Sequence, residues 1–462
     1  MINRERKPVI HARQALLAEG WAQNVRLTVT DGRITGIHPN SGAEPGDVTV
    51  DTLLPSLGNL HSHAFQRAMA GMTEYRQPGR DSFWTWRTLM YRFMDRLTAD
   101  HIQAIAAQVY VEMLESGYAS VGEFHYVHHQ PGGRPYENLA ELSNRIFAAA
   151  SETGIGLTHL PVLYTYGGAG RADATEGQRR FCNSVDGFSR LVEAAAAGLL
   201  SLPSDARIGI APHSLRATAP EDLDRVVAAH GHGPIHIHIA EQPKEIADIQ
   251  DWLGARPVEW LLNNTEVDRR WCLIHATHMT GAETRALAAS NAVAGLCPIT
   301  EANLGDGPFN GPDYVAAGGR FGLGSDSNVN ISLTEELRTL EYAQRLRDTG
   351  RNVMVAGEGS VGAFLYTAAA QGGAQALDRD AGEIAEGKLG DLVAIDSAAP
   401  ALCALTREQL LDGLVFAAKD DVVTDVWSAG RHMVQGGRHV SRDMIFGTYR
   451  KAMRDLMSGA SL

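Results

Sequence analysis

The sequence reads Asn59-Leu60-His61-Ser62-His63 shortly after the apolar run Thr52-Leu53-Leu54-Pro55-Ser56-Leu57. We expect this segment to be a strand. Because side chains alternate between the two faces of a strand, His61 and His63 then point the same way. Two imidazoles on one face at a strand end can bind one divalent metal ion. In a chain with 18 histidines the pair alone is weak evidence, so its meaning depends on the residues that follow.

Three later stretches also place a candidate ligand or proton-transfer group where an apolar, β-prone run ends. His238 and Glu241 stand in His-Ile-Ala-Glu, His275 stands in Leu-Ile-His-Ala-Thr-His, and Asp326 stands in Gly-Leu-Gly-Ser-Asp-Ser. Four such elements in this order are hard to explain as coincidence. They predict a metal site assembled from the ends of several strands.

The middle of the chain alternates strand-like and helix-like stretches, which predicts a parallel sheet with crossover helices. Amphipathic runs over 100–116, 184–199 and 220–229 are typical of such helices. With the strand that ends at His61, the strand-like stretches number eight, as in a TIM (β/α)8 barrel, an α/β fold whose candidate ligands would lie at the carboxyl ends of the strands. The other seven stretches are 119–124, 156–163, 207–211, 235–239, 271–274, 292–296 and 321–324.

Both ends of the chain have the texture of short strands joined by turns. Residues 25–29 lead through Asp31-Gly32 into 33–37, which is a hairpin signal, and similar stretches return at 392–396 and 422–427. We therefore expect a small β-sandwich domain formed from both termini, with the barrel inserted into it. The expected boundaries are 1–52 and 387–445 for the small domain, 53–386 for the barrel and 446–462 for a C-terminal helical tail.

Composition excludes several classes of protein. The chain has 462 residues and a formal charge of −13, which argues against a nucleic acid or an anionic membrane as partner. No apolar run is long enough to cross a bilayer, and the polar start is not a signal peptide. Four widely spaced cysteines indicate free thiols in a reducing cytoplasm: Cys182, Cys272, Cys297 and Cys403.

The candidate ligands fit one Zn²⁺ ion, with Fe²⁺ as the alternative, and leave a position for water whose pKa the cation would lower towards neutrality. Glu241 follows His238 by three residues and could move a proton between that water and a leaving group. His275 could bind the metal or hydrogen-bond the hydroxide. Asp326 could bind the metal, accept the proton of the water, or do both.

With these candidate ligands and Glu241, the chain resembles the amidohydrolase superfamily over nearly its full length, in particular its single-metal deaminase branch. Five further stretches are more particular: Leu60-His61-Ser62-His63-Ala64-Phe65-Gln66-Arg67, Asp81-Ser82-Phe83-Trp84-Thr85-Trp86-Arg87, Gly122-Glu123-Phe124-His125-Tyr126, Ala211-Pro212-His213-Ser214-Leu215-Arg216 and Pro298-Ile299-Thr300-Glu301-Ala302-Asn303-Leu304-Gly305-Asp306-Gly307. On these stretches the chain is most similar, within that branch, to the formimidoylglutamate deiminase family of histidine degradation.

This resemblance implies hydrolysis of N-formimidoyl-L-glutamate to N-formyl-L-glutamate and ammonia by a cytoplasmic enzyme, commonly a homodimer. The substrate carries two carboxylates, for which Arg87 and Arg216 are the candidate partners because guanidinium groups match carboxylates in paired hydrogen bonds. The resemblance adds Gln66, Tyr126 and His213 as substrate contacts. It leaves open whether Trp84 and Trp86 form a lid or the packed interior of their own loop.

Three alternatives stay open at this point. A related single-metal deaminase could act on guanine or another purine-type substrate. A two-metal hydrolase is disfavoured, because such barrels usually bridge their metals through a carboxylated lysine and no lysine occurs between Lys7 and Lys244. A non-enzymatic relative would be expected to lack at least one of the candidate catalytic residues, and all are present. Fold alone does not decide among these functions.

Overall fold

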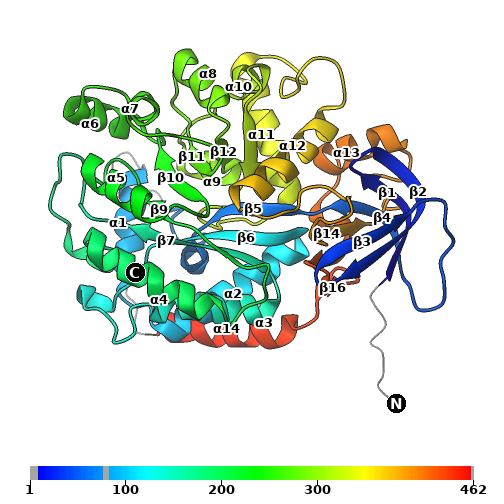
Figure 1. Cartoon of the computed structure of the whole chain (residues 1–462), viewed down its shortest axis with the longest axis horizontal. Coiled ribbons are helices and arrows are strands. Elements are labelled where there is room, and N and C mark those ends of the chain that lie inside the picture. The colour runs from blue at the N-terminus through cyan, green and yellow to red at the C-terminus, as the bar shows by residue number, and fades with distance from the viewer. Residues whose placement is uncertain (1–8, 76–82, 459–462) are drawn as a thin grey trace.

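The computed structural model describes residues 9–75 and 83–458, and its centre is a barrel of parallel strands surrounded by helices (Figure 1). The strands follow one another around the barrel in chain order. They are β5 (Leu57–Ser62), β6 (Tyr118–His125), β7 (Gly156–Leu163), β8 (Arg207–Ile208) with β9 (Ala211–Pro212), β10 (Ile235–Ile239), β11 (Trp271–His275), β12 (Val293–Leu296) and β13 (Arg320–Leu323).

Two parallel bridges close this sheet into a ring. Ile210 pairs with Ile235, which joins the β7–β9 side to β10, and Ser62 pairs with Asp326, which joins the end of β5 to the segment after β13. With β8 and β9 taken as one interrupted strand, the barrel has eight strands. The predicted TIM barrel is confirmed.

The crossover helices form where the sequence has helical spacing of apolar residues and a capping side chain. In α4 (Val185–Leu199) the buried positions include Val185, Phe188 and Val192, which share one face, and the Ser184 side chain accepts a hydrogen bond from the backbone N–H of Gly187. The amphipathic runs predicted at 100–116 and 220–229 are α2 (Ala99–Glu115) and α5 (Pro220–Ala229). The other helices around the barrel are α1 (Phe83–Met94), α3 (Glu141–Thr153), α6 (Pro243–Leu253), α7 (Pro257–Asn264), α8 (Gly281–Ala289), α9 (Pro298–Leu304), α10 (Gly311–Ala316), α11 (Leu333–Asp348) and α12 (Val361–Ala376).

Both chain ends contribute to a second sheet beside the barrel, ordered β17-β16-β15-β14-β4-β1-β2-β3, and it encloses a separate hydrophobic core that includes Leu27, Leu53, Leu392 and Trp427. The predicted terminal β domain is thus present. Its strands are β1 (Val9–Leu17), β2 (Gly20–Thr30), β3 (Arg33–His38), β4 (Val48–Pro55), β14 (Leu392–Ile395), β15 (Val423–Ser428), β16 (Arg431–Gln435) and β17 (Arg438–His439).

The junction between the two sheets fixes the direction of the barrel. The apolar run at 52–57 is divided, because β4 ends in the terminal sheet at Pro55 and β5 begins the barrel at Leu57. The terminal domain therefore lies at the end where β5 starts, and the carboxyl ends of the strands point away from it (Figure 1). The expected boundary at residue 52 falls inside β4. Two further helices are α13 (Arg407–Phe416) and α14 (Arg442–Met457), the latter packed against α2.

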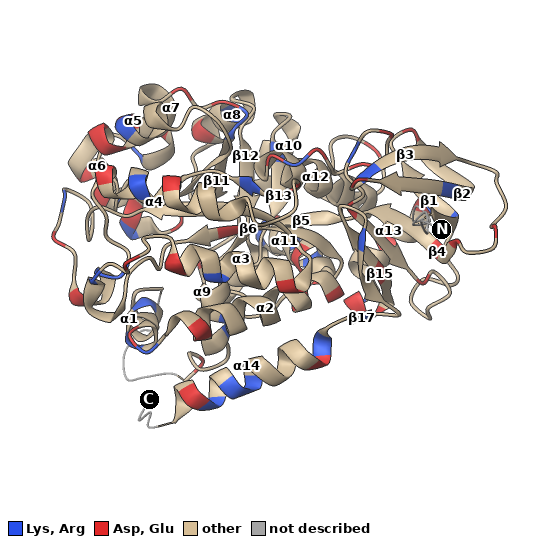
Figure 2. Ribbon diagram, turned by 60° about the horizontal axis from the view of Figure 1, so that its bottom comes forward, with Lys and Arg blue, Asp and Glu red and all other residues tan. Residues whose placement is uncertain are grey.

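The outer surface carries charge of both signs, and Figure 2 shows Lys and Arg interspersed with Asp along α14. None of the described helices combines the length and the apolarity that crossing a bilayer requires.

A buried ionic cluster links the barrel to the terminal sheet. The guanidinium of Arg379, which follows α12, is fully buried and donates to Asp391 at 3.0 Å and to Asp205 at 3.2 Å. Arg431 of β16 also donates to Asp205, at 2.7 Å. Asp205 precedes β8 and Asp391 precedes β14, so the cluster joins the two sheets through charge-assisted hydrogen bonds.

Replacing Arg379 by Met should destabilise the protein by about 3–5 kcal/mol, because it leaves Asp391 buried without its cationic partner and Asp205 with Arg431 alone. The measurement is the free energy of unfolding in urea. Arg225→Met is the matched control, since Arg225 pairs with Asp186 on the surface and exposed pairs contribute about 0–1 kcal/mol. Equal stabilities for the two variants would contradict a structural role for the cluster.

Candidate metal centre and active site

The candidate ligands converge at the carboxyl end of the barrel. His61 lies near the end of β5, and His63 directly follows that strand. His238 lies in β10, and Asp326 follows β13. All four are buried, and one ligand atom from each lies within 4.8 Å of the others. The Asp326 Oδ1 atom is 3.5 Å from Nε2 of His61 and 3.3 Å from Nε2 of His63, and the Nε2 atoms of His61 and His238 are 3.1 Å apart. The four side chains predicted as ligands therefore converge in the folded chain.

The imidazoles have the protonation that metal binding needs. Nδ1 of His63 donates to the Phe124 carbonyl at 3.0 Å, and Nδ1 of His238 donates to the His213 carbonyl at 3.1 Å. The lone pair of Nε2 in each ring is therefore available to bind a metal ion. Burial lowers the pKa of His61 to about 3 and also lowers the pKa of His63 and His238. These rings are therefore neutral at physiological pH.

Asp326 is held against β5 by its own backbone. Its N–H donates to the His61 carbonyl and its carbonyl accepts from the His63 N–H, both at 2.9 Å. Its φ of +47° lies in the left-handed region, a strained conformation that functional sites often contain. Gly324 permits the approach, because a Cβ atom there would lie 2.7 Å from Cβ of His61.

A network of polar side chains supports the same segment. Asn59 donates to the Ser325 hydroxyl at 2.7 Å, Ser325 donates to Asn328 at 2.6 Å, and Asn328 donates to Ser62 at 3.2 Å. All these residues are buried. Burial opposes ionisation of Asp326, but its interactions with the neighbouring histidines, chiefly His61, outweigh this and lower its pKa. The donor set of three neutral imidazoles and one carboxylate fits a divalent metal ion.

Glu241 and His275 lie beside this set. Nε2 of His275 is 3.7 Å from Glu241 and 3.9 Å from Asp326, and its Nδ1 contacts Glu301 at 3.3 Å. Burial raises the pKa of Glu241. For His275, burial alone would lower the pKa, but the surrounding carboxylates, first of all Glu241, raise it to about 10. His275 stands outside the convergent group of four ligand atoms, in a position to hold a proton between two carboxylates.

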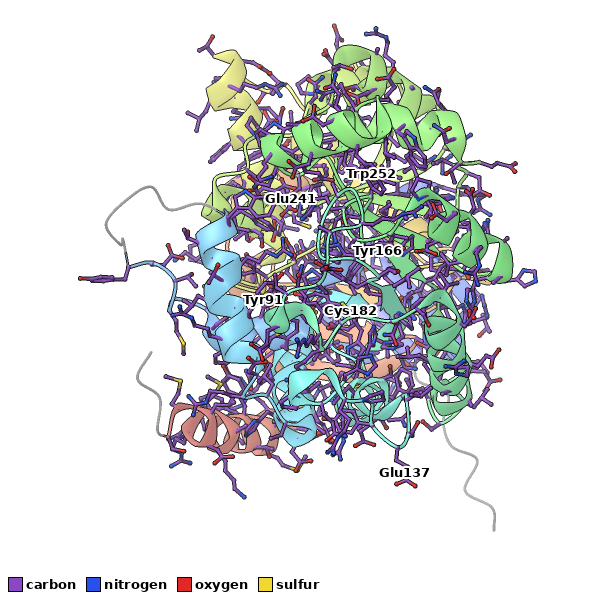
Figure 3. All side chains as sticks on the ribbon, turned by 90° about the vertical axis from the view of Figure 1, so that its left-hand side faces the viewer. Tyr91, Glu137, Tyr166, Cys182, Glu241 and Trp252 are labelled. Atoms are coloured by element: carbon purple, nitrogen blue, oxygen red, sulfur yellow. The ribbon has the colours of Figure 1, made fainter. Side chains whose placement is uncertain are left out.

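A cavity opens over these groups at the carboxyl end of the barrel. Figure 3 views that end of the barrel, where Tyr91 of α1 and Glu241 both lie. The five residues predicted as substrate contacts all line the cavity: Gln66, Arg87, Tyr126, His213 and Arg216. Also in its wall are Phe83, Trp86, Met90, Tyr91, Tyr164, Phe181, Leu304 and Ser327.

The two predicted arginines differ in how they are held. Arg87 donates to the hydroxyls of Tyr91 and Tyr164, the latter at 3.0 Å. Arg216 is buried, and its Nη2 lies 3.5 Å from Glu241 while its Nε lies 3.9 Å from Glu245. That Nε has no hydrogen-bond partner among the described residues. Both guanidiniums thus retain donors that a ligand could use.

Several residues of the site were not singled out for a role by the sequence. Tyr91 and Tyr164 hold Arg87. Tyr91 follows Arg87 by four residues on α1, a helical spacing that could have indicated the contact, whereas Tyr164 comes from the segment after β7 and no local pattern relates it to Arg87. Glu245 accepts backbone N–H groups of Ala240 and Glu241, at 3.2 and 3.0 Å, one turn after the Glu241 motif. Glu301 belongs to the motif over 298–307, but the sequence did not indicate its contact with His275.

Two further observations concern neighbours of the site. His236 lies two residues before His238 in β10, and its Nε2 donates to the Ala376 carbonyl at 2.8 Å, outside the ligand group. Of the tryptophan-rich motif, Asp81 and Ser82 lie outside the described residues. Its other members, from Phe83 on, belong to α1.

Comparison with family models gives two matches. A model of the amidohydrolase family matches residues 52–433, and a model described as the N-terminal domain of formimidoylglutamate deiminase HutF matches residues 7–49. Together they cover the barrel and most of the terminal sheet.

Similar proteins give the same grouping. The formimidoylglutamate deiminase of Pseudomonas aeruginosa is 49% identical over 97% of this chain and 99% of its own length. A 5-methylthioadenosine/S-adenosylhomocysteine deaminase of Natronomonas pharaonis is 26% identical over 86% of this chain and 84% of its own length.

Solved structures extend the likeness to the fold. An amidohydrolase from Brucella melitensis, 48% identical, superposes with a TM-score of 0.93 over 98% of this chain and all of its own. An adenosine deaminase from Xanthomonas campestris with bound zinc is 20% identical, with a TM-score of 0.81 over 98% and 99%, and shares the fold. Because the family model spans most of the chain and the Pseudomonas relative is half identical throughout, this chain belongs to the amidohydrolase family and, within it, groups with the formimidoylglutamate deiminases.

Proposed function

We propose that this protein hydrolyses N-formimidoyl-L-glutamate to N-formyl-L-glutamate and ammonia in histidine degradation. The observation that carries the proposal is a pair of guanidiniums with unused donors in the same cavity as the Glu241–His275 pair. The full-length likeness to a formimidoylglutamate deiminase supports it.

The charge of the cavity suits a substrate with two carboxylates. Burial raises the pKa of Tyr91, so the hydroxyl that Arg87 contacts stays neutral, and no carboxylate in the described part of the chain pairs with Arg87. Arg216 has only the loose contacts with Glu241 and Glu245. In a protein of net charge −13, two such cations favour a ligand that brings its own negative charge.

We propose one divalent metal ion per subunit, Zn²⁺ with Fe²⁺ as the alternative, held by His61, His63, His238 and Asp326. When bound, the ion supplies Lewis-acid activation of water at neutral pH. The neutral imidazoles and the ionised carboxylate described above are the forms that these residues need for this role.

Glu241, His275 and Asp326 carry the proposed proton transfers. Water adds to the formimidoyl carbon, the C–N bond to the terminal nitrogen breaks, and that nitrogen leaves as ammonia. Glu241, whose raised pKa suits a group that gains and loses a proton, accepts a proton from water and delivers it to the departing nitrogen. His275 holds a proton at Nε2 beside the reacting atoms. Asp326 accepts the second proton of the water and passes it on to the departing nitrogen, so that this nitrogen leaves as ammonia with both protons.

Gln66, Tyr126 and His213 complete the proposed substrate contacts. Gln66 donates to the Tyr126 hydroxyl at 2.7 Å, which fixes both side chains in the cavity wall. Burial lowers the pKa of His213, so its ring is neutral and contributes hydrogen bonding rather than charge. The purine-deaminase alternative is less well supported, because its substrate would not use two arginines.

The oligomeric state and the cellular compartment of the protein are also predictions. We propose a homodimer in the cytoplasm that uses no nucleic acid or membrane partner. The cysteines are free in the structure, as a reducing compartment would require.

The function is tested by product analysis of the purified, zinc-loaded protein with N-formimidoyl-L-glutamate, with guanine as the comparison substrate. We expect ammonia and N-formylglutamate in equal amounts and no turnover of guanine. Formamide with glutamate would show that the other C–N bond breaks, and turnover of guanine alone would refute the proposed substrate.

His238→Ala should reduce the bound metal to well below one ion per subunit, because a ligand that converges on the other three is lost. The measurement is metal content by mass spectrometry after dialysis. His236→Gln is the matched control, since His236 lies two residues earlier in β10 and bonds the Ala376 carbonyl instead. Full metal content in His238→Ala would exclude His238 as a ligand.

Glu241→Gln should lower kcat by about 100- to 10,000-fold, because an amide cannot transfer the protons. Steady-state kinetics measures this effect, and unchanged metal content shows that the metal centre is intact. Glu259→Gln, an exposed carboxylate of α7, serves as the control and should keep wild-type kcat. A Glu241→Gln enzyme within tenfold of wild type would remove Glu241 from the mechanism.

A further inference from the structure

We propose that Trp84 is the positioning residue that holds Arg87 and Arg216 at the spacing required by a substrate with two carboxylates. The proposal rests on the proposed function and deepens it, because it names what sets the selectivity of the two guanidiniums. Trp84 acts through the arginines and does not itself contact substrate.

Three cations surround the Trp84 indole. The Cζ atoms of Arg87 and Arg216 lie 5.6 and 5.9 Å from the ring centroid, and Nζ of Lys244 lies 5.7 Å from it. These distances are within the range in which a cation is attracted to the negative face of an aromatic ring. Tryptophan gives the strongest attraction of this kind.

The indole joins parts of the chain that are far apart in sequence. Trp84, Arg87 and Tyr91 share one face of α1, because they are spaced three and four residues apart. Arg216 comes from the segment after β9, and Lys244 comes from the first turn of α6. Trp84 therefore connects α1, which carries one guanidinium, to the loop that carries the other.

Among the described residues, Phe83 and Trp86 line the cavity, whereas Trp84 does not. Its contacts are thus with the cations that face the ligand. Trp84 thus supports the two arginines from behind the cavity wall. This gives Trp84 a role that the sequence left open.

The three cations are not equivalent. Lys244 is half exposed and its charge is met by Asp248 at 2.6 Å, within the same helix. Arg87 contacts neutral hydroxyls, and Arg216 has no hydrogen-bonded carboxylate. The indole is therefore a shared electrostatic partner of the two guanidiniums whose charge the site uses.

Arg216 in particular has a competing position. Its Nη2 is already 3.5 Å from Glu241, so a small movement would tighten this ion pair into a direct hydrogen bond with the proposed proton-transfer group. The indole attracts the guanidinium away from that pairing. Loss of the ring is expected to leave Arg216 less available to a carboxylate of the substrate.

The test compares two substrates, N-formimidoyl-L-glutamate with two carboxylates and N-formimidoylglycine with one. In Trp84→Leu, we expect KM for the first to rise about tenfold or more with a smaller change in kcat, which is the size of two lost cation–π contacts. The preference for the first substrate, as a ratio of kcat/KM values, should fall by a similar factor. Trp84→Phe retains an aromatic face and should keep most of the preference.

Controls separate positioning from folding. Trp252→Leu removes an indole from α6 that makes no cation–π contact in the described structure, and it should leave both substrates unaffected. Metal content and the midpoint of thermal unfolding are measured for every variant. Trp84→Met supplies a second non-aromatic side chain if the leucine variant does not fold.

Each outcome decides the proposal. A preference within twofold of wild type in a folded Trp84→Leu or Trp84→Met enzyme would overturn it, as would equal losses with the two substrates. Failure of the wild-type enzyme to act on N-formimidoyl-L-glutamate refutes the proposed function instead, and is seen before any variant is made.

Discussion

The site depends on the closure of the barrel between β5 and the segment after β13. The backbone of Asp326 pairs on both sides with the strand that carries His61 and His63, through two hydrogen bonds of 2.9 Å. One contact thus completes the ring of strands and brings the carboxylate to two imidazoles. Because Gly324 is required for that approach, the Gly-Leu-Gly-Ser-Asp-Ser stretch serves closure and ligand placement together. A shift of this segment would change the fold and the candidate metal centre at once.

Burial then sets the chemistry of the groups that closure brings together. The same exclusion of water keeps His61 neutral and raises the pKa of Glu241, while the carboxylates around His275 raise its pKa. The pKa of a histidine in this site thus depends on its neighbours, which is why His61 can act as a ligand and His275 can carry a proton. The positive charge of the cavity comes from α1 and from the loop after β9, two elements that the barrel strands hold over the same end.

Much of the fold was predictable because it depends on local pattern. Short apolar, β-prone runs located the barrel strands, and helical spacing of apolar residues located helices such as α4. Turn residues located the terminal strands. The division at Pro55 was not predictable, because the apolar run continues through it and only pairing shows that β4 and β5 belong to different sheets. Tyr164 was also missed, since it reaches Arg87 of α1 only through packing of segments that are distant in the sequence.

The residue types at the strand ends could be read from the amino-acid sequence, and a closed parallel barrel with these strands in order brings His61, His63, His238 and Asp326 together. The candidate acid–base pair and the two arginines could be named in the same way, since their identities are local. The folded chain was needed to show that His275 stands beside the ligand group and that Trp84 lies among three cations. Such relations depend on distances between side chains from separate loops, and these follow from packing rather than from the order of residues along the chain.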